Sequence, residues 1–174
     1  MLIGVPARGL ETALTWAGSG QTLATNYMKD RCFVDTNILL YAHDLSTGVK
    51  HQRAETLVEQ LWDSRLGVLS TQVLQELCVS LQRKTAHPPA AKEIRALIED
   101  YLAWEVVTNT GASVLEGLDI AERYRISFWD ALILHAAETA GTPILLSEDL
   151  SDGQKYGTVR VVNPFSNPGF AISG

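Results

Sequence analysis

Four acidic residues stand at places along the chain from which their carboxylates could converge on one site: Asp35, Glu76, Asp130 and Asp149. The first of them directly follows the apolar run Cys32-Phe33-Val34, which predicts a short buried strand, and it precedes the apolar start of a helix. In open α/β sheets, ligands bind outside the carboxyl ends of the strands, so an acid in this position would face a site. Asp35 could equally serve only as the N-terminal cap of the following helix, since Asp caps helices well.

Each of the other three acids also has a plain structural interpretation. Asp130 follows Ser127 at the spacing of a helix capping box. Glu76 borders the apolar stripe of a predicted helix, where glutamates more often reach solvent than bind a ligand. Asp149 follows the predicted strand 143–146 in a polar stretch typical of a turn. No single acid is therefore decisive, and the hypothesis of a site depends on their convergence.

Convergence of these acids would define a particular chemistry. Carboxylates that meet without a matching Lys or Arg repel one another and raise each other's pKa. Divalent cations relieve that repulsion, and ligation by oxygen alone favours Mg²⁺ or Mn²⁺ over zinc. Such sites commonly hydrolyse phosphodiesters, because one metal generates hydroxide near neutral pH and another stabilises the leaving oxygen. The residues alone thus predict a metal-dependent enzyme of phosphoryl transfer.

Strand and helix patterns alternate along most of the chain, which predicts an α/β fold with a parallel sheet covered on both faces. The apolar strands show no polar alternation, as expected for strands buried on both sides. We expect strands at 32–34, 67–69, 104–108, 143–146 and 158–162, and helices at about 50–62, 71–84, 88–102, 114–124 and 128–140. Parallel strands of this kind would bring the residues after 32–34 and after 143–146 to the same edge of the sheet.

The composition limits the classes of protein that the chain can belong to. A net charge of −6 argues against a broad basic surface for nucleic acid, although clustered metal-binding carboxylates would supply several of those charges. The sequence shows no apolar run that would span a membrane and no secretory signal, and Cys32 and Cys78 lack metal-site spacing. We therefore expect a cytoplasmic protein without a membrane partner. Residues 1–27, rich in Gly, Thr and Ala, are expected to be an arm that either lies upstream of a natural start at Met28 or tethers a partner.

Four segments, in order, resemble the PIN domain family, and most closely the VapC-type toxin ribonucleases of bacterial toxin–antitoxin pairs. They are FVDTNILLY, STQVLQELCVSL, RISFWDALILHAA and LLSEDLSDGQ, and the resemblance extends from about residue 30 to residue 165. It implies that residues 28–174 form a PIN-like nuclease domain, a three-layer α/β/α sandwich with a mostly parallel central sheet. It also implies an endoribonuclease that uses Mg²⁺ or Mn²⁺, a cognate antitoxin protein and a homodimer.

The resemblance further implies a role for individual residues. The catalytic and metal-binding set would be Asp35, Glu76, Asp130 and Asp149. The small polar residues beside them would orient the carboxylates: Thr36, Asn37 and Ser147. Asp152 is a weaker candidate contributor to the metal site. The expected reaction is in-line attack of a metal-bound water on a backbone phosphate of RNA, which leaves a 3′-hydroxyl and a 5′-phosphate.

Two other functions are compatible with parts of the pattern. Phosphoryl-transfer enzymes of the haloacid-dehalogenase kind also place an Asp after the first strand, but they need a second Asp two residues later, where this chain has Asn37. A PIN-like module could bind RNA or a protein without cutting, although the presence of all four acids counts against it. The sequence does not indicate which RNA would be cut or which antitoxin would bind.

Overall fold

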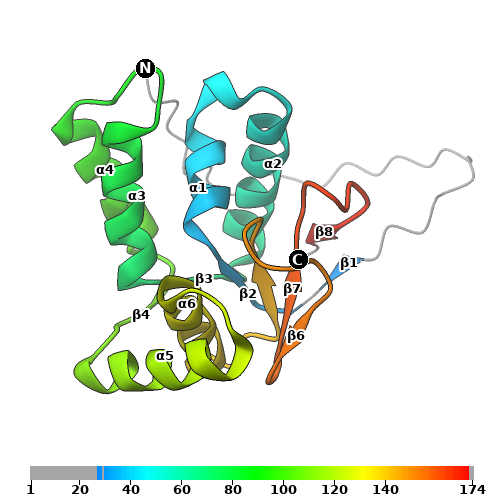
Figure 1. The fold of residues 1–174 in the computed structure, drawn as a ribbon. Helices are drawn as coiled ribbons and strands as arrows, with labels where there is room; N and C mark the ends of the chain where they lie inside the picture. Colours follow the sequence, from blue (N-terminus) through cyan, green and yellow to red (C-terminus); the bar gives the residue numbers. More distant parts are fainter. Residues whose placement is uncertain (1–26, 29, 173–174) are drawn as a thin grey trace, which may run out of the picture.

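The computed structural model describes residues 27–28 and 30–172. Within these residues, six strands form one sheet in the order β4-β3-β2-β5-β7-β6 (Figure 1). Their bounds are β2 (Cys32–Val34), β3 (Gly67–Ser70), β4 (Glu105–Val107), β5 (Ile144–Leu146), β6 (Lys155–Tyr156) and β7 (Val159–Val162). All neighbouring strands pair in parallel except β6, which runs antiparallel to β7 at the edge. The predicted mostly parallel sheet is confirmed.

Helices cover both faces of this sheet, which confirms the three-layer α/β/α architecture (Figure 1). They are α1 (Thr36–His43), α2 (Val49–Ser64), α3 (Thr71–Arg83), α4 (Ala91–Tyr101), α5 (Gly111–Tyr124) and α6 (Phe128–Thr139), with a short 3₁₀ helix at Leu45–Thr47. Helices α1 and α2 pack together on one side, and α5 and α6 pack together on the other. None of the helices in the described part of the chain is long and apolar enough to span a bilayer.

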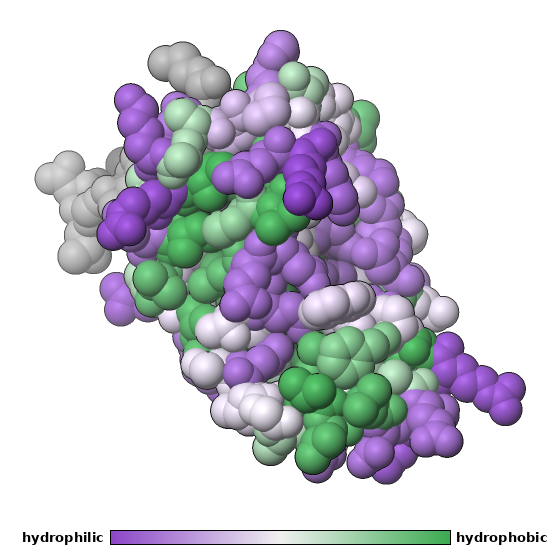
Figure 2. Space-filling model, turned by 60° about the vertical axis from the view of Figure 1, so that its left-hand side comes forward, coloured by the Kyte–Doolittle hydropathy of each residue, from purple (hydrophilic) through white to green (hydrophobic). Residues whose placement is uncertain are grey.

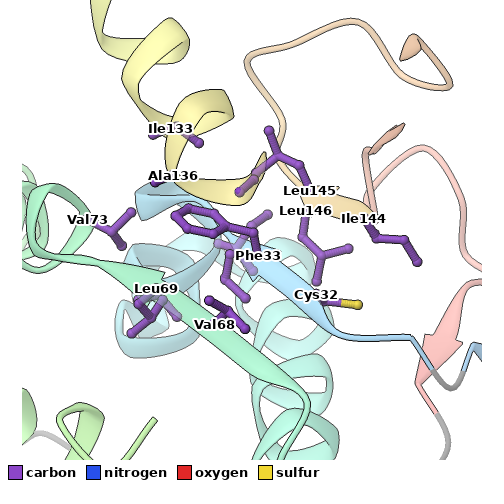
Figure 3. Close-up of a cluster of buried hydrophobic side chains, with 14 of the residues drawn as sticks. Cys32, Phe33, Val68, Leu69, Val73, Ile133, Ala136, Ile144, Leu145 and Leu146 are labelled. Atoms are coloured by element: carbon purple, nitrogen blue, oxygen red, sulfur yellow. The ribbon is translucent and has the colours of Figure 1, made fainter. Parts of the chain in front are cut away.

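Strands β2 and β5 form the centre of the core because their residues are apolar on both faces. Phe33 of β2 lies opposite Leu145 of β5, and both side chains are fully buried (Figure 3). The register continues to Val34 opposite Leu146, after which the backbone N–H of Asp35 donates to the Leu146 carbonyl at 3.0 Å. The two strands therefore end together, and the residues that follow them emerge side by side.

Local sequence signals fix the ends of several elements as expected. Ser70 caps α3 by accepting a hydrogen bond from the Val73 N–H, and Gly141, with φ of +65°, follows the end of α6. Gly67 is required at the start of β3, because a Cβ there would lie 2.2 Å from the Trp104 ring. This close approach lets the indole pack over the strand.

The sequence prediction differs from the structure in three places. The prolines Pro88 and Pro89 precede α4 instead of lying in its first turn, and the Glu93 carboxylate accepts the N–H of Ala90 there. Strand β6 was not predicted, because two residues are too few to show a period. A separate parallel pair, β1 (Tyr27–Met28) with β8 (Ala171–Ile172), was also missed. Residues 1–26 lie outside the described residues, so the interpretation of 1–27 as an arm stays a prediction.

Candidate active site

Asp35 is the centre of the candidate site and is almost completely buried, with 4% of its surface exposed. It caps α1: its Oδ1 accepts the Thr36 N–H at 2.6 Å. Its Oδ2 accepts the hydroxyl of Ser147 at 2.7 Å and the side-chain amide of Asn37 at 3.1 Å. Burial raises the pKa of Asp35 to about 7, against the opposing effect of these hydrogen bonds, and the charges of Asp149 and Glu76 raise it further.

Asp149 joins Asp35 through a shared amide. The Nδ2 group of Asn37 donates to Asp149 Oδ2 at 3.0 Å as well as to Asp35, so one side chain bridges two carboxylates. The Ser147 hydroxyl accepts the backbone N–H of Asp149 at 3.2 Å while it donates to Asp35. Asn37 and Ser147 therefore both contact Asp35 and Asp149, as residues that orient these carboxylates would. Asp149 is a turn residue that also contacts the side chains around Asp35.

Glu76 reaches the same centre from α3. Its Oε2 accepts the Thr36 hydroxyl at 2.9 Å, and its Oε1 accepts the side-chain amide of Gln72 at 2.9 Å, one turn earlier on the helix. Gln72 is itself buried, and its oxygen accepts the Asn109 amide at 3.3 Å. Glu76 is thus held at the site by hydrogen bonds and does not simply extend into solvent. Gln72 and Asn109 were not predicted, because their positions in the sequence carry no functional signal.

Asp130 lies at the border of this network. Its backbone N–H donates to the Ser127 hydroxyl at 3.1 Å, and its Oδ2 accepts that hydroxyl at 2.7 Å. Ser127 therefore caps α6, but in the described residues the carboxylate does not complete the predicted capping box by accepting the Ser127 backbone N–H. The first turn of α6 is tied to the other acids through the Trp129 carbonyl, which accepts the Gln72 amide at 3.1 Å. Within the described residues, Asp35 is therefore linked to Asp149 through Asn37 and Ser147, and to Glu76 through Thr36. Asp130 shares no hydrogen bond with these three acids in the described part of the chain, and its helix is linked to Glu76 only through Gln72.

Two further acids near the end of β5 have other partners. Asp152 accepts the backbone N–H of Asn163 and the amide of Asn167, each at 2.8 Å, and these bonds lower its pKa. Asp152 thus stabilises the segment after β7. Among the described residues, it forms no hydrogen bond with any of the four candidate acids. Glu148 forms an ion pair with Lys50 and accepts the Tyr41 hydroxyl at 2.7 Å. No motif or period in the sequence indicates this pair.

The donor chemistry of the site fits a hard divalent cation. The four carboxylates offer only oxygen, and within the described residues no Lys or Arg pairs with any of them. The Asn37 Oδ1 is buried and, in the part of the chain that is described, has no hydrogen-bond partner. As the side chains stand, no three acidic, His or Cys groups of the described residues are arranged to hold one ion. Mg²⁺ does not need three such groups, because it commonly keeps several waters and is held by one or two carboxylates.

Comparison with known proteins places the chain in a family. The PIN domain profile matches residues 32–151, which include Asp35, Glu76, Asp130 and Asp149. The chain therefore belongs to the PIN domain family. Proteins of this family are nucleases and generally use a divalent metal. No curated protein sequence matches the chain.

Solved structures similar to the chain come from toxin–antitoxin systems. VapC20 of Mycobacterium tuberculosis, described as a toxin that cleaves the sarcin–ricin loop, aligns with a TM-score of 0.54 at 22% identity, over 68% of this chain and 89% of its own. A toxin–antitoxin complex of Klebsiella pneumoniae aligns with 0.54 at 18% identity, over 76% and 97%. The DNA-bound VapBC of Salmonella typhimurium aligns with 0.51 at 18% identity, over 75% and 96%. At these identities the likeness establishes the fold.

Proposed function

We propose that this protein is an endoribonuclease dependent on Mg²⁺ or Mn²⁺, and that it is the toxin of a toxin–antitoxin pair. The observation that carries the proposal is the buried Asp35 carboxylate, connected to Asp149 and Glu76 and without a cationic partner among the described residues. A buried anion of this kind is unfavourable unless a cation joins it. Membership of a nuclease family makes RNA cleavage the natural use of such a site.

The metal-binding residues in this proposal are Asp35, Asp149, Glu76 and Asp130. When bound, Mg²⁺ or Mn²⁺ supplies a water of lowered pKa and stabilises charge on the phosphate and the leaving oxygen. The chain's own contribution is to hold the ligands in place. Ser147 and Asn37 donate hydrogen bonds to the Asp35 carboxylate and thereby fix the orientation of this ligand.

The remaining residues in the site keep the carboxylates apart and oriented. Thr36 donates its hydroxyl to Glu76 while its backbone N–H binds Asp35, so the first residue of α1 sets the spacing of two acids. Gln72 holds the other Glu76 oxygen and the backbone of α6 at Trp129. These contacts support orienting roles for Thr36 and Gln72 in metal binding.

A protein partner is part of the proposal. Several of the similar structures are complexes of a toxin with its antitoxin, which supports an antitoxin for this chain too. Exposed apolar side chains support protein contacts, including a second copy: Figure 2 shows hydrophobic surface at the α5 end of the molecule, where Val114, Leu115 and Leu118 are exposed. An enzyme that cuts cellular RNA and is restrained by an antitoxin would act in the cytoplasm.

The experiment is cleavage of total RNA by the purified protein, freed of antitoxin, with Mg²⁺ or Mn²⁺ and with EDTA. Asp35→Asn removes the central charge at constant size, and Asp119→Asn is the matched control, the same change at an exposed position of α5. We expect metal-dependent cleavage by the wild type and the control, and none by Asp35→Asn. Folded protein that binds RNA but never cuts it would contradict the proposal and favour the non-catalytic binding module.

A further inference from the structure

A cation is tied to the segment that carries Asp149, although within the described residues it pairs with none of the four candidate acids. The Lys50 ammonium forms an ion pair with Glu148, the residue directly before Asp149. The same ammonium lies 3.5 Å from the Tyr41 hydroxyl and 4.8 Å from the centre of the Tyr41 ring. The centre of the Phe165 ring, which packs edge to face against Tyr41, lies 5.5 Å from the ammonium. Two aromatic faces and one carboxylate thus hold this charge in a defined place.

The helix that carries Lys50 does not explain its presence. Lys50 belongs to the first turn of α2, where the helix dipole disfavours a cation and favours an acid. That turn contains no acid, and its N-cap is Gly48, which has no side chain to bond the free N–H groups. The first turn of α2 therefore presents only positive charge, and the group that neutralises it comes from the loop after β5.

The accessibility of the two partners is unequal. The Lys50 side chain is 41% exposed and that of Glu148 is 24% exposed. An exposed ammonium can exchange one anion for another at little loss, because exposed ion pairs contribute little to stability. The two rings would keep the ammonium in place during such an exchange. Phosphate oxygens are the anions that an RNA-cutting site brings to this position.

We propose that Lys50 binds a backbone phosphate of single-stranded RNA beside the cleaved bond, and that Glu148 occupies the ammonium until RNA displaces it. This inference rests on the proposed function. It adds a substrate-binding residue to a site whose other charges are all negative. It also gives Glu148 a distinct role: a carboxylate that competes with the substrate and thereby weakens RNA binding in the free protein.

The alternative is that the Lys50–Glu148 pair is only a structural brace for the loop that carries Asp149. The two interpretations predict opposite signs for one variant. If Glu148 competes with RNA, Glu148→Gln releases Lys50 and tightens RNA binding. If the pair is a brace, Glu148→Gln loosens Asp149 and leaves RNA binding unchanged or weaker.

The test measures binding of a fluorescein-labelled single-stranded RNA of mixed sequence by anisotropy, with EDTA and with every variant in the Asp35→Asn protein so that cleavage does not interfere. We expect Lys50→Gln to weaken binding about three- to ten-fold and to lower the salt dependence of log K by ~0.7, the loss of one phosphate contact on a single strand. Lys50→Arg should restore the salt dependence. Glu148→Gln should tighten binding, and should do so far less when Lys50→Gln is also present.

Glu59→Gln is the matched control for Glu148→Gln, because it removes one exposed negative charge from α2, the helix that carries Lys50. Tighter binding by Glu148→Gln beyond that of the control supports competition for Lys50. The inference is overturned by an unchanged salt dependence in Lys50→Gln, or by binding in Glu148→Gln that is no tighter than that of the control. RNA cleavage by the wild-type protein would in either case leave the proposed function standing. No RNA binding and no cleavage by the wild type would overturn both.

Discussion

Replacement of Asp35 by Asn should remove a pH-dependent loss of stability from the metal-free protein, and it should also remove the stabilisation of the protein by Mg²⁺. In the metal-free protein, the folded state holds this carboxyl at a pKa of about 7, above its ordinary value of 3.8, chiefly because it is buried. A carboxyl with a raised pKa contributes stability that is fully present below its unfolded value and is lost as pH rises through the folded value. The wild type should therefore lose stability between pH 5 and pH 8 through Asp35, and the variant should not.

The size of the effect follows from the same two values. Ionisation of Asp35 between pH 5 and pH 8 removes about 2.5 kcal/mol from the free energy of unfolding, because one pKa unit corresponds to about 1.4 kcal/mol. The amide that Asp35→Asn introduces would also meet the Asn37 amide as a second donor, which offsets part of any gain by about 1–3 kcal/mol at every pH. The change with pH, and not the absolute difference, is thus the quantity to compare.

Denaturant unfolding of both proteins, in EDTA at pH 5 and pH 8, measures that change. We expect the stability of Asp35→Asn relative to wild type to rise by about 2.5 kcal/mol over this interval. Mg²⁺ at about a hundred times its dissociation constant should then stabilise the wild type by ~2.7 kcal/mol and the variant by almost nothing. A difference between the two proteins that does not vary with pH, or equal stabilisation of both by Mg²⁺, would refute the reasoning.

Three further substitutions separate the site from its surroundings. Gln72→Ala should lower metal-dependent RNA cleavage at least ten-fold, because it releases one oxygen of Glu76. Circular dichroism should show little change in the overall fold, and unchanged cleavage would argue against the orienting role of Gln72. Asp152→Ala should lower the free energy of unfolding in urea by about 1–2 kcal/mol, because Asp152 holds the C-terminal segment by hydrogen bonds. The cleavage rate per folded molecule should stay unchanged, and a selective loss of cleavage would place Asp152 in the metal site. Gly67→Ala should lower the free energy of unfolding by about 2–4 kcal/mol, because its Cβ would overlap the Trp104 ring, and an unaffected melting temperature would show that the indole moves aside freely.

The sequence predicts much of this site because its main elements are local and the sheet obeys a general rule. The apolar run before Asp35 predicts a buried strand, and a parallel partner ending at Leu146 brings Ser147 to the same edge. The hydrogen bond between Ser147 and Asp35 joins residues 112 apart, yet it follows from the register of β2 and β5. In a parallel sheet, the positions of strand ends therefore predict which residues far apart in the sequence lie close together.

The parts that could not be predicted depend on where long side chains reach. Lys50 and Glu148 lie 98 residues apart on a helix and a loop, and no period or motif relates them. The amide of Asn109 meets Gln72 because β4 pairs with β3, so that the residues after β4 lie beside the first turn of α3. Such contacts arise from tertiary packing, so a pattern of residue types does not reveal them.

The central claim is that the carboxylates around Asp35 bind a divalent cation, and calorimetric titration of Mn²⁺ into the metal-stripped protein tests it most directly. We expect saturable Mn²⁺ binding by the wild type, which Asp35→Asn abolishes and Asp119→Asn leaves intact. The number of protons released on binding should grow as the pH is lowered toward 6. Equal Mn²⁺ binding by wild type and Asp35→Asn, or RNA cleavage that persists in EDTA, would contradict it.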